Sequence, residues 1–92
     1  MGHLMKQPTF QEIEKILRNV IEGITSREEA SGWAYFYIRY DQTHDIEITD
    51  PQAWHLLTAV SCCAELIAPD VYLYQEEDFR AWLDDYQKKD NF

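Results

Sequence analysis

The chain has 92 residues with 17 acidic and 8 basic side chains, so its formal net charge is −9. The length suits one domain with a modest core, and the 46% hydrophobic content excludes a disordered chain. No apolar run approaches the roughly 18 residues of a membrane span. We expect a single helical domain over residues 9–87, a flexible segment over residues 1–8 and a tail over residues 88–92.

The acidic residues are concentrated in the second half of the sequence. Residues 1–40 hold five acidic and five basic side chains, whereas residues 41–92 hold twelve acidic and three basic ones. Such a charge distribution repels nucleic acid and anionic membranes and favours basic surfaces. The acidic residues either keep the protein in solution or bind a basic protein partner, and the sequence predicts such a partner, no direct contact with nucleic acid and no membrane contact.

The first predicted helix begins at Thr9, because Thr9 and Glu12 have the spacing of a capping box. Gly23 suits the cap that ends such a helix. Apolar residues recur between these signals at steps of three and four, as on one helix face: Phe10, Ile13, Leu17, Val20, Ile21 and Ile24.

The second predicted helix begins at Thr25 or Ser26, each of which precedes a glutamate by three residues. A β-hairpin across residues 41–45 is the alternative, because the aromatic run before it suits a strand and residues 46–49 alternate in polarity. The immediate capping signals favour the helix. One face of that helix carries its apolar residues: Ala30, Trp33, Ala34, Tyr37 and Ile38.

The third predicted helix has Asp50 as its N-cap and Pro51 at its first position. Its apolar periodicity runs to Ile67, and Ala68 and Pro69 end it. Its predicted buried face is the most regular in the chain: Ala53, Leu56, Leu57, Val60, Cys63, Ala64 and Ile67.

A loop or short extended segment over residues 70–75 separates the third helix from the fourth. The fourth helix starts with three acids, which the helix dipole favours there: Glu76, Glu77 and Asp78. Lys88 and Lys89 lie near its other end, again with the favourable sign. Its buried face is expected to hold Phe79, Trp82, Leu83 and Tyr86.

Four amphipathic helices with short connections predict an all-α fold, a four-helix bundle that is antiparallel or irregular. Three tryptophans, each on a different helix, are expected to anchor its core: Trp33, Trp54 and Trp82.

We find no pattern typical of catalysis or of a cofactor, and we expect a protein that is not an enzyme. Cys63 lies on an apolar face, and Cys62 stands about 10 Å along the helix from His55, too far for a Cys–His pair. No histidine pair has zinc spacing. The acidic run over residues 41–52 fails a calcium loop where glycine and the final glutamate are required. Adjacent cysteines and the absence of a signal peptide indicate the cytoplasm.

The helix signals together resemble a pattern in small acidic bacterial proteins akin to the colicin D-type immunity family. The resemblance covers roughly residues 10–86 and depends on Thr25-Ser26-Arg27-Glu28-Glu29-Ala30, Trp33-Ala34, Asp50, Trp54, Leu57, Tyr72-Leu73-Tyr74, Asp78-Phe79 and Trp82-Leu83. It implies a four-helix bundle that neutralises a tRNA-cleaving toxin by presenting acidic groups to its basic surface.

The function expected from the sequence is therefore that of a non-enzymatic immunity protein, a toxin inhibitor that binds a basic nuclease. The predicted partner-binding residues are all acidic: Asp41, Asp45, Glu47, Glu76, Glu77, Asp78, Asp84 and Asp85. One alternative is a structural or regulatory module that forms a homodimer through an aromatic patch at Tyr35, Phe36 and Tyr40. Another is an enzyme or metal protein built around His44 and His55.

Overall fold

Capping side chains determine where the first two helices begin. The computed structural model describes residues 5–89, in which α1 (Phe10–Ile21) follows Thr9 and α2 (Arg27–His44) follows Ser26. The Thr9 hydroxyl accepts the Glu12 N–H at 3.2 Å, and the Ser26 hydroxyl accepts the Glu29 N–H at 3.0 Å. The Glu29 carboxylate accepts the Ser26 N–H in return, which completes a capping box. Both predicted helix starts are confirmed.

Carboxylates also accept backbone N–H groups at the starts of the two later helices. Before α3 (Pro51–Ser61), the Asp50 carboxylate accepts the Ala53 N–H at 3.1 Å. Before α4 (Glu76–Lys89), the Gln75 N–H donates to the Asp78 carboxylate at 2.7 Å. The predicted starts of the third and fourth helices are thus confirmed as well.

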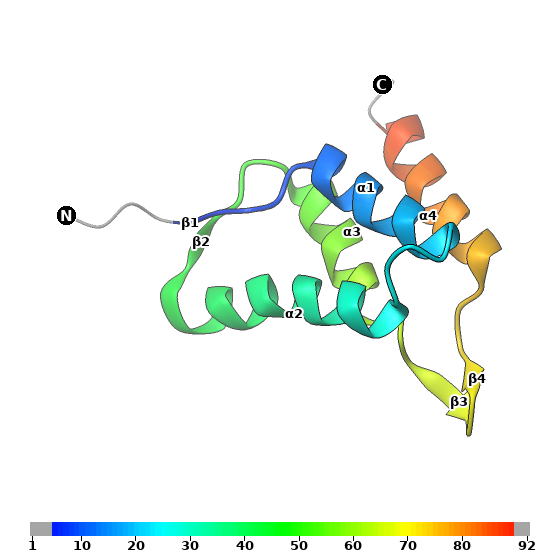
Figure 1. Ribbon diagram of the computed structural model, residues 1–92. Helices are drawn as coiled ribbons and strands as arrows, with labels where there is room; N and C mark the ends of the chain where they lie inside the picture. Colours follow the sequence, from blue (N-terminus) through cyan, green and yellow to red (C-terminus); the bar gives the residue numbers. More distant parts are fainter. Residues whose placement is uncertain (1–4, 90–92) are drawn as a thin grey trace.

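Two short sheets accompany the four helices, so the prediction of an all-α four-helix bundle is wrong, although the protein is mostly helical (Figure 1). β1 (Met5–Lys6) pairs in parallel with β2 (Ile46–Glu47). β3 (Leu66–Ala68) and β4 (Val71–Tyr72) form an antiparallel hairpin. Strands of two or three residues are too short to produce a polarity pattern in the sequence.

The predicted alternative of a hairpin across residues 41–45 is wrong, because α2 continues as one helix to His44. Ile46 and Glu47 do form a strand, but their partner is β1, about 40 positions earlier in the chain. Asp45, with a φ of 61°, makes the sharp turn between α2 and β2.

The third helix ends six residues before the predicted end, at Ser61. Residues 66–68 instead form the first strand of the hairpin. The turn of this hairpin contains Asp70, which has a φ of 61°. Ile67, expected on the buried helix face, is 64% exposed on β3. Six more helical residues would carry the chain about 9 Å beyond the core, whereas the hairpin returns it to the start of α4.

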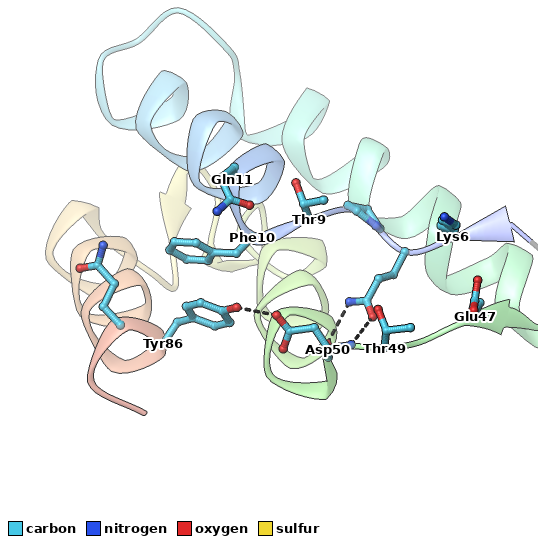
Figure 2. A pocket seen from close by; sticks show the side chains of 11 residues that line it. Lys6, Thr9, Phe10, Gln11, Glu47, Thr49, Asp50 and Tyr86 are labelled. Carbon is cyan, nitrogen blue, oxygen red and sulfur yellow. Dashed lines mark hydrogen bonds between the residues drawn. The ribbon is translucent and has the colours of Figure 1, made fainter. Parts of the chain in front are cut away.

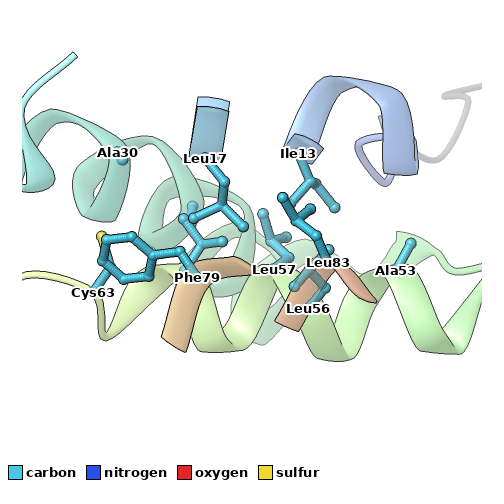
Figure 3. Close-up of a cluster of buried hydrophobic side chains, with 11 residues drawn as sticks. Ile13, Leu17, Ala30, Ala53, Leu56, Leu57, Cys63, Phe79 and Leu83 are labelled. Carbon is cyan, nitrogen blue, oxygen red and sulfur yellow. The ribbon is translucent and has the colours of Figure 1, made fainter. Parts of the chain in front are cut away.

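The core forms around α3, which contacts the three other helices (Figure 3). α1 contributes Ile13 and Leu17, and α4 contributes Phe79 and Leu83. The fully buried residues of α2 are the small Ala30 and Ala34, which let this helix pack closely against α3. The three tryptophans pack against this core but are only half-buried, so they flank it rather than fill it. The fully or nearly fully buried set on and just after α3 is Ala53, Leu56, Leu57, Val60 and Cys63.

Within residues 5–89, none of the helices has both the length and the apolar character needed to cross a membrane. The predicted flexible segment over residues 1–8 and tail over residues 88–92 lie partly outside the described residues. They and the single domain over residues 9–87 stay predictions.

Candidate functional site

The outward face of α2 forms an open groove of about 700 Å³, which we call the α2 groove. It arises because the opposite face of the helix, with Ala30 and Ala34, is buried, and a 3.6-residue period brings the remaining residues together. A Cβ atom added at Gly32 would meet nothing within 4 Å, so the groove is open at this point. Its lining is Glu28, Ser31, Gly32, Tyr35, Phe36, Arg39, Tyr40, Thr43, His44 and Ala64.

Aromatic rings follow one another along the α2 groove at successive helical turns. The ring centroids of Phe36 and Tyr40 are 6.2 Å apart, and those of Tyr40 and His44 are 4.7 Å apart with nearly parallel planes. Tyr35 and Phe36 are 51% and 54% exposed. The groove thus presents ring surface to solvent, although burial of such surface is favourable.

Two hydroxyl groups of the α2 groove are already engaged within the protein. The Ser31 hydroxyl donates to the Ser61 carbonyl at 2.6 Å. The Thr43 hydroxyl lies 3.2 Å from the Tyr40 carbonyl and 2.7 Å from Nδ1 of His44. These groups are therefore poorly placed to hold a ligand by directed hydrogen bonds.

The charge of the α2 groove differs from that of the whole molecule. No acidic residue occurs between Ala30 and Tyr40, and Arg39 is the one charged residue in that run. Glu28, at one end of the groove, accepts a hydrogen bond from the Tyr72 hydroxyl at 2.7 Å. That bond, above all other causes, raises the pKa of Tyr72. The middle of the groove therefore lacks the negative charge found elsewhere in the molecule.

Arg39 differs from the other three arginines in what its guanidinium contacts. Arg18 pairs with Glu14 at 2.9 Å, and Arg80 pairs with Glu76 at 2.8 Å, each along one helix. Within residues 5–89, Arg39 makes no ion pair of this kind. Its charge is therefore available to an external anion.

Arg27 has a structural role that the sequence did not indicate. Its guanidinium lies 4.2 Å from the centroid of the Tyr72 ring and 4.8 Å from that of Phe79. It also donates hydrogen bonds to the carbonyls of Cys63 and Tyr74. Arg27 thus joins the start of α2 to both ends of the hairpin segment, through partners 36 and 47 residues away.

The eight acids predicted to bind a partner do not form one patch. Asp41, Asp45 and Glu47 lie around the end of α2 and in β2, whereas the other five lie on α4, on the opposite side of the molecule from that end of α2 (Figure 1). Asp41 and Asp78 accept backbone N–H groups, so each also has a structural role. A partner-binding role of these residues stays a prediction.

A second cavity, of about 820 Å³, lies where residues 6–11 meet the start of α3 (Figure 2). The side chain of Gln7, which is 8% exposed, forms two hydrogen bonds with the backbone of Asp50, at 2.8 and 2.9 Å. The Tyr86 hydroxyl donates to the Asp50 carboxylate, and the Tyr86 ring stacks on Phe10 at 4.0 Å. These contacts hold the N-terminal segment, α3 and α4 together.

This second cavity is unsuited to a phosphate group, although two helices begin beside it. The Asp50 carboxylate already accepts the N–H of Ala53 at the start of α3, and Glu47 adds a second negative charge against Lys6. Helix N-termini without neighbouring carboxylates attract anions. Here the two carboxylates give the cavity a net negative charge, which repels an anion.

His44 and His55, the basis of the enzyme or metal alternative, lie in different hollows. In the part of the chain that the structure describes, no three His, Cys, Asp or Glu side chains are grouped to hold a metal ion. Cys62 and Cys63 are free thiols, and Cys63 is fully buried, which confirms its predicted place in the core. Burial raises the pKa of the Cys63 thiol to about 11, so it is a poor nucleophile at neutral pH.

Comparisons with known proteins identify one family. The model of the family described as "YxzC DNA-binding protein" matches residues 6–86. The "Uncharacterized protein YxzC" of Bacillus subtilis (strain 168) is 31% identical over 70 residues, which are 76% of this chain and 55% of that protein. The chain thus spans about half the length of this curated relative. No solved structure matches.

These matches overturn three expectations from the sequence. They point to the YxzC family, so the resemblance to the colicin D-type immunity family is wrong. The expected function of an immunity protein and toxin inhibitor loses its support with that resemblance. The exclusion of nucleic acid as a direct partner conflicts with the description of the matching family. Net charge alone does not exclude nucleic acid, because binding depends on the charge of the surface that makes contact.

Proposed function

Because the chain belongs to the YxzC DNA-binding protein family, we propose that it binds DNA and that the α2 groove is the surface of contact. The observation that carries the proposal is a combination found in this groove: exposed rings, an arginine outside the described ion pairs and a run without acids. Rings and cations are the two kinds of side chain that bind nucleic acid without a base-specific contact.

Electrostatics restrict where DNA can approach this protein. A net charge of −9 repels phosphate at long range. Repulsion is weakest where carboxylates are absent, since charges farther away than about 8–10 Å are largely screened at physiological salt. α4 carries five of the predicted acidic site residues and meets α2 at the first residue of that helix, Arg27, rather than at the rings of the groove. In this proposal DNA therefore approaches the middle of the α2 groove, between Glu28 and Asp41, where it meets less repulsion than over α4.

Arg39 is the residue on which phosphate contact depends in this proposal. It lies beside Phe36 and Tyr40, so a phosphate held by its guanidinium would place the attached nucleotide over the rings. Arg18 and Arg80 already have carboxylate partners and would have to exchange them.

We further propose that the protein acts by binding alone, without catalysis. We also propose that it is located in the cytoplasm, where it would encounter DNA.

Paired arginine variants test the proposal. Fluorescence anisotropy with a labelled oligonucleotide at low salt measures the affinity of the full chain, of Arg39→Ala and of Arg80→Ala. Both variants lower the net charge by one unit, and Arg80→Ala also frees the Glu76 carboxylate from its ion pair on α4, outside the groove. We expect Arg39→Ala to weaken binding about fivefold, since one exposed charge-assisted contact contributes about 1 kcal/mol, and Arg80→Ala to change it less than twofold. Equal effects, or no binding by the full chain, would contradict the proposal.

A further inference from the structure

We infer that the DNA bound in the α2 groove is single-stranded, with an unpaired base stacked on the exposed ring of Phe36, at one end of the ring series of Phe36, Tyr40 and His44. This inference rests on the proposed function and specifies its substrate. The rings occur at every fourth residue of α2, where the helix rises about 6 Å. Neighbouring centroids are 6.2 and 4.7 Å apart, and Phe36 leaves half of its surface open at one end of the series.

The scarcity of cations disfavours duplex DNA as the ligand. A duplex carries one negative charge per about 1.7 Å of its axis, and proteins that bind it neutralise several phosphates at once. The α2 groove supplies one arginine, with Glu28 at its border and Asp41 just beyond it. Contacts to phosphate alone would therefore give the duplex little affinity, and the rest of the acidic surface would repel its second strand.

Stacking supplies affinity that does not depend on the charge of the protein. Every base has a π-face, and aromatic side chains bind successive unpaired bases through it. In a duplex those faces are covered by neighbouring base pairs, so only the base edges and the backbone remain accessible. A surface with several rings and one arginine therefore favours a strand whose bases are free.

Two of the hydroxyl groups of the groove, those of Ser31 and Thr43, are poorly placed to read a base. Reading a base requires donors and acceptors aimed at its edge. The Ser31 hydroxyl is bound to the Ser61 carbonyl, and that of Thr43 lies against backbone carbonyls and His44. Ser31 and Thr43 therefore add little base specificity, and stacking on a ring tolerates all bases.

Three labelled 20-nucleotide ligands test the inference with the full chain: a thymidine single strand, a duplex and a single strand of abasic sites. The abasic strand keeps the phosphates but has no bases to stack. We expect the thymidine strand to bind at least tenfold more tightly than the other two. A duplex that binds as tightly as the single strand would overturn this inference and leave the proposed function intact, whereas failure of all three to bind would refute the proposed function itself.

Substitutions at Phe36 separate stacking from general apolar contact. Phe36→Leu keeps an apolar side chain and removes the ring, and Phe36→Trp enlarges the ring. We expect Phe36→Leu to bind the thymidine strand roughly tenfold more weakly than the original chain does. Phe36→Trp should bind this strand at least as tightly as the original chain. Neither variant should change the affinity for the duplex by more than twofold. Leu66→Ala is the matched control, because Leu66 is 55% exposed on β3, outside the groove. Equal affinities of the leucine and tryptophan variants for the single strand would overturn the inference.

Discussion

Single residues in this protein differ sharply in environment even when they are neighbours in sequence. Cys62 is half-buried at the end of α3, whereas Cys63 is fully buried and its thiol lies 3.4 Å from the Arg27 carbonyl. Burial raises the pKa of the Cys63 thiol to about 11 from an ordinary value near 9.0. The thiolate of Cys63 is therefore disfavoured in the folded protein.

We expect thiol labelling at pH 8 to modify Cys62 but not Cys63 in the native chain. The Cys62→Ser variant should show no reactive thiol until denaturant is added, when one appears. Because the folded protein holds the Cys63 proton more tightly than the unfolded one, the contribution of this thiol to stability is complete below about pH 9 and is lost as the pH rises toward 11. Rapid labelling of native Cys62→Ser would contradict this account.

Gln7, like Arg27, has structural contacts that the sequence did not indicate. Its side-chain amide forms two hydrogen bonds with the backbone N–H and carbonyl of Asp50, 43 residues away. Gln7→Ala should lower the free energy of unfolding by about 1 kcal/mol, because it leaves two partly buried backbone groups of Asp50 without these partners. Urea unfolding measures this change, with the exposed Gln11 of the same cavity as the control position. Equal effects of Gln7→Ala and Gln11→Ala would show that the amide pair contributes little.

At the scale of elements, local signals predicted helix starts better than helix ends. Thr9, Ser26 and Asp50 each cap a backbone N–H three residues on, which is a local event. The end of α3 depends instead on distant partners, since Arg27 binds the carbonyls of Cys63 and Tyr74. The strand at Ile46 likewise depends on Met5. Periodicity within one segment contains no information on such long-range contacts.

The sequence left Thr25 and Ser26 as equal candidates for the cap of α2, and the structure selects Ser26. We expect Ser26→Ala to reduce stability by about 1 kcal/mol, the usual contribution of an N-cap. Thr25→Ala, which does not remove the capping bond, should cost less than half as much. Thermal or urea unfolding of the two variants measures the difference, and a larger loss with Thr25→Ala would show that α2 starts elsewhere.

The candidate site was visible in the sequence as an aromatic patch at Tyr35, Phe36 and Tyr40, but with a different role. A net charge of −9 made a basic protein the expected partner, because composition reports the sum of charges and not their positions. The fold separates the α2 groove from the acids of α4. The position of carboxylates on the surface is a property of the folded molecule. A count of charged residues in the sequence does not give it.

Few phosphate contacts also predict an unusual salt dependence. Each neutralised phosphate of a single strand contributes about −0.7 to the slope of log affinity against log salt concentration. With Arg39 as the one cation in the groove, we expect a slope of about −0.7 and no steeper than about −2. A slope of −5 or steeper, measured by anisotropy over a salt series, would indicate an extensive basic contact surface and contradict this account.

The central claim, that DNA contacts the α2 groove, is tested most directly by NMR. A ¹⁵N-labelled full chain titrated with a thymidine oligonucleotide reports which backbone amides sense the ligand. We predict that the largest shift changes fall on residues 28–44 and Ala64, and that α4 shows little change. Changes centred on α4 or on the cavity beside Asp50, or no changes at millimolar oligonucleotide, would contradict the claim.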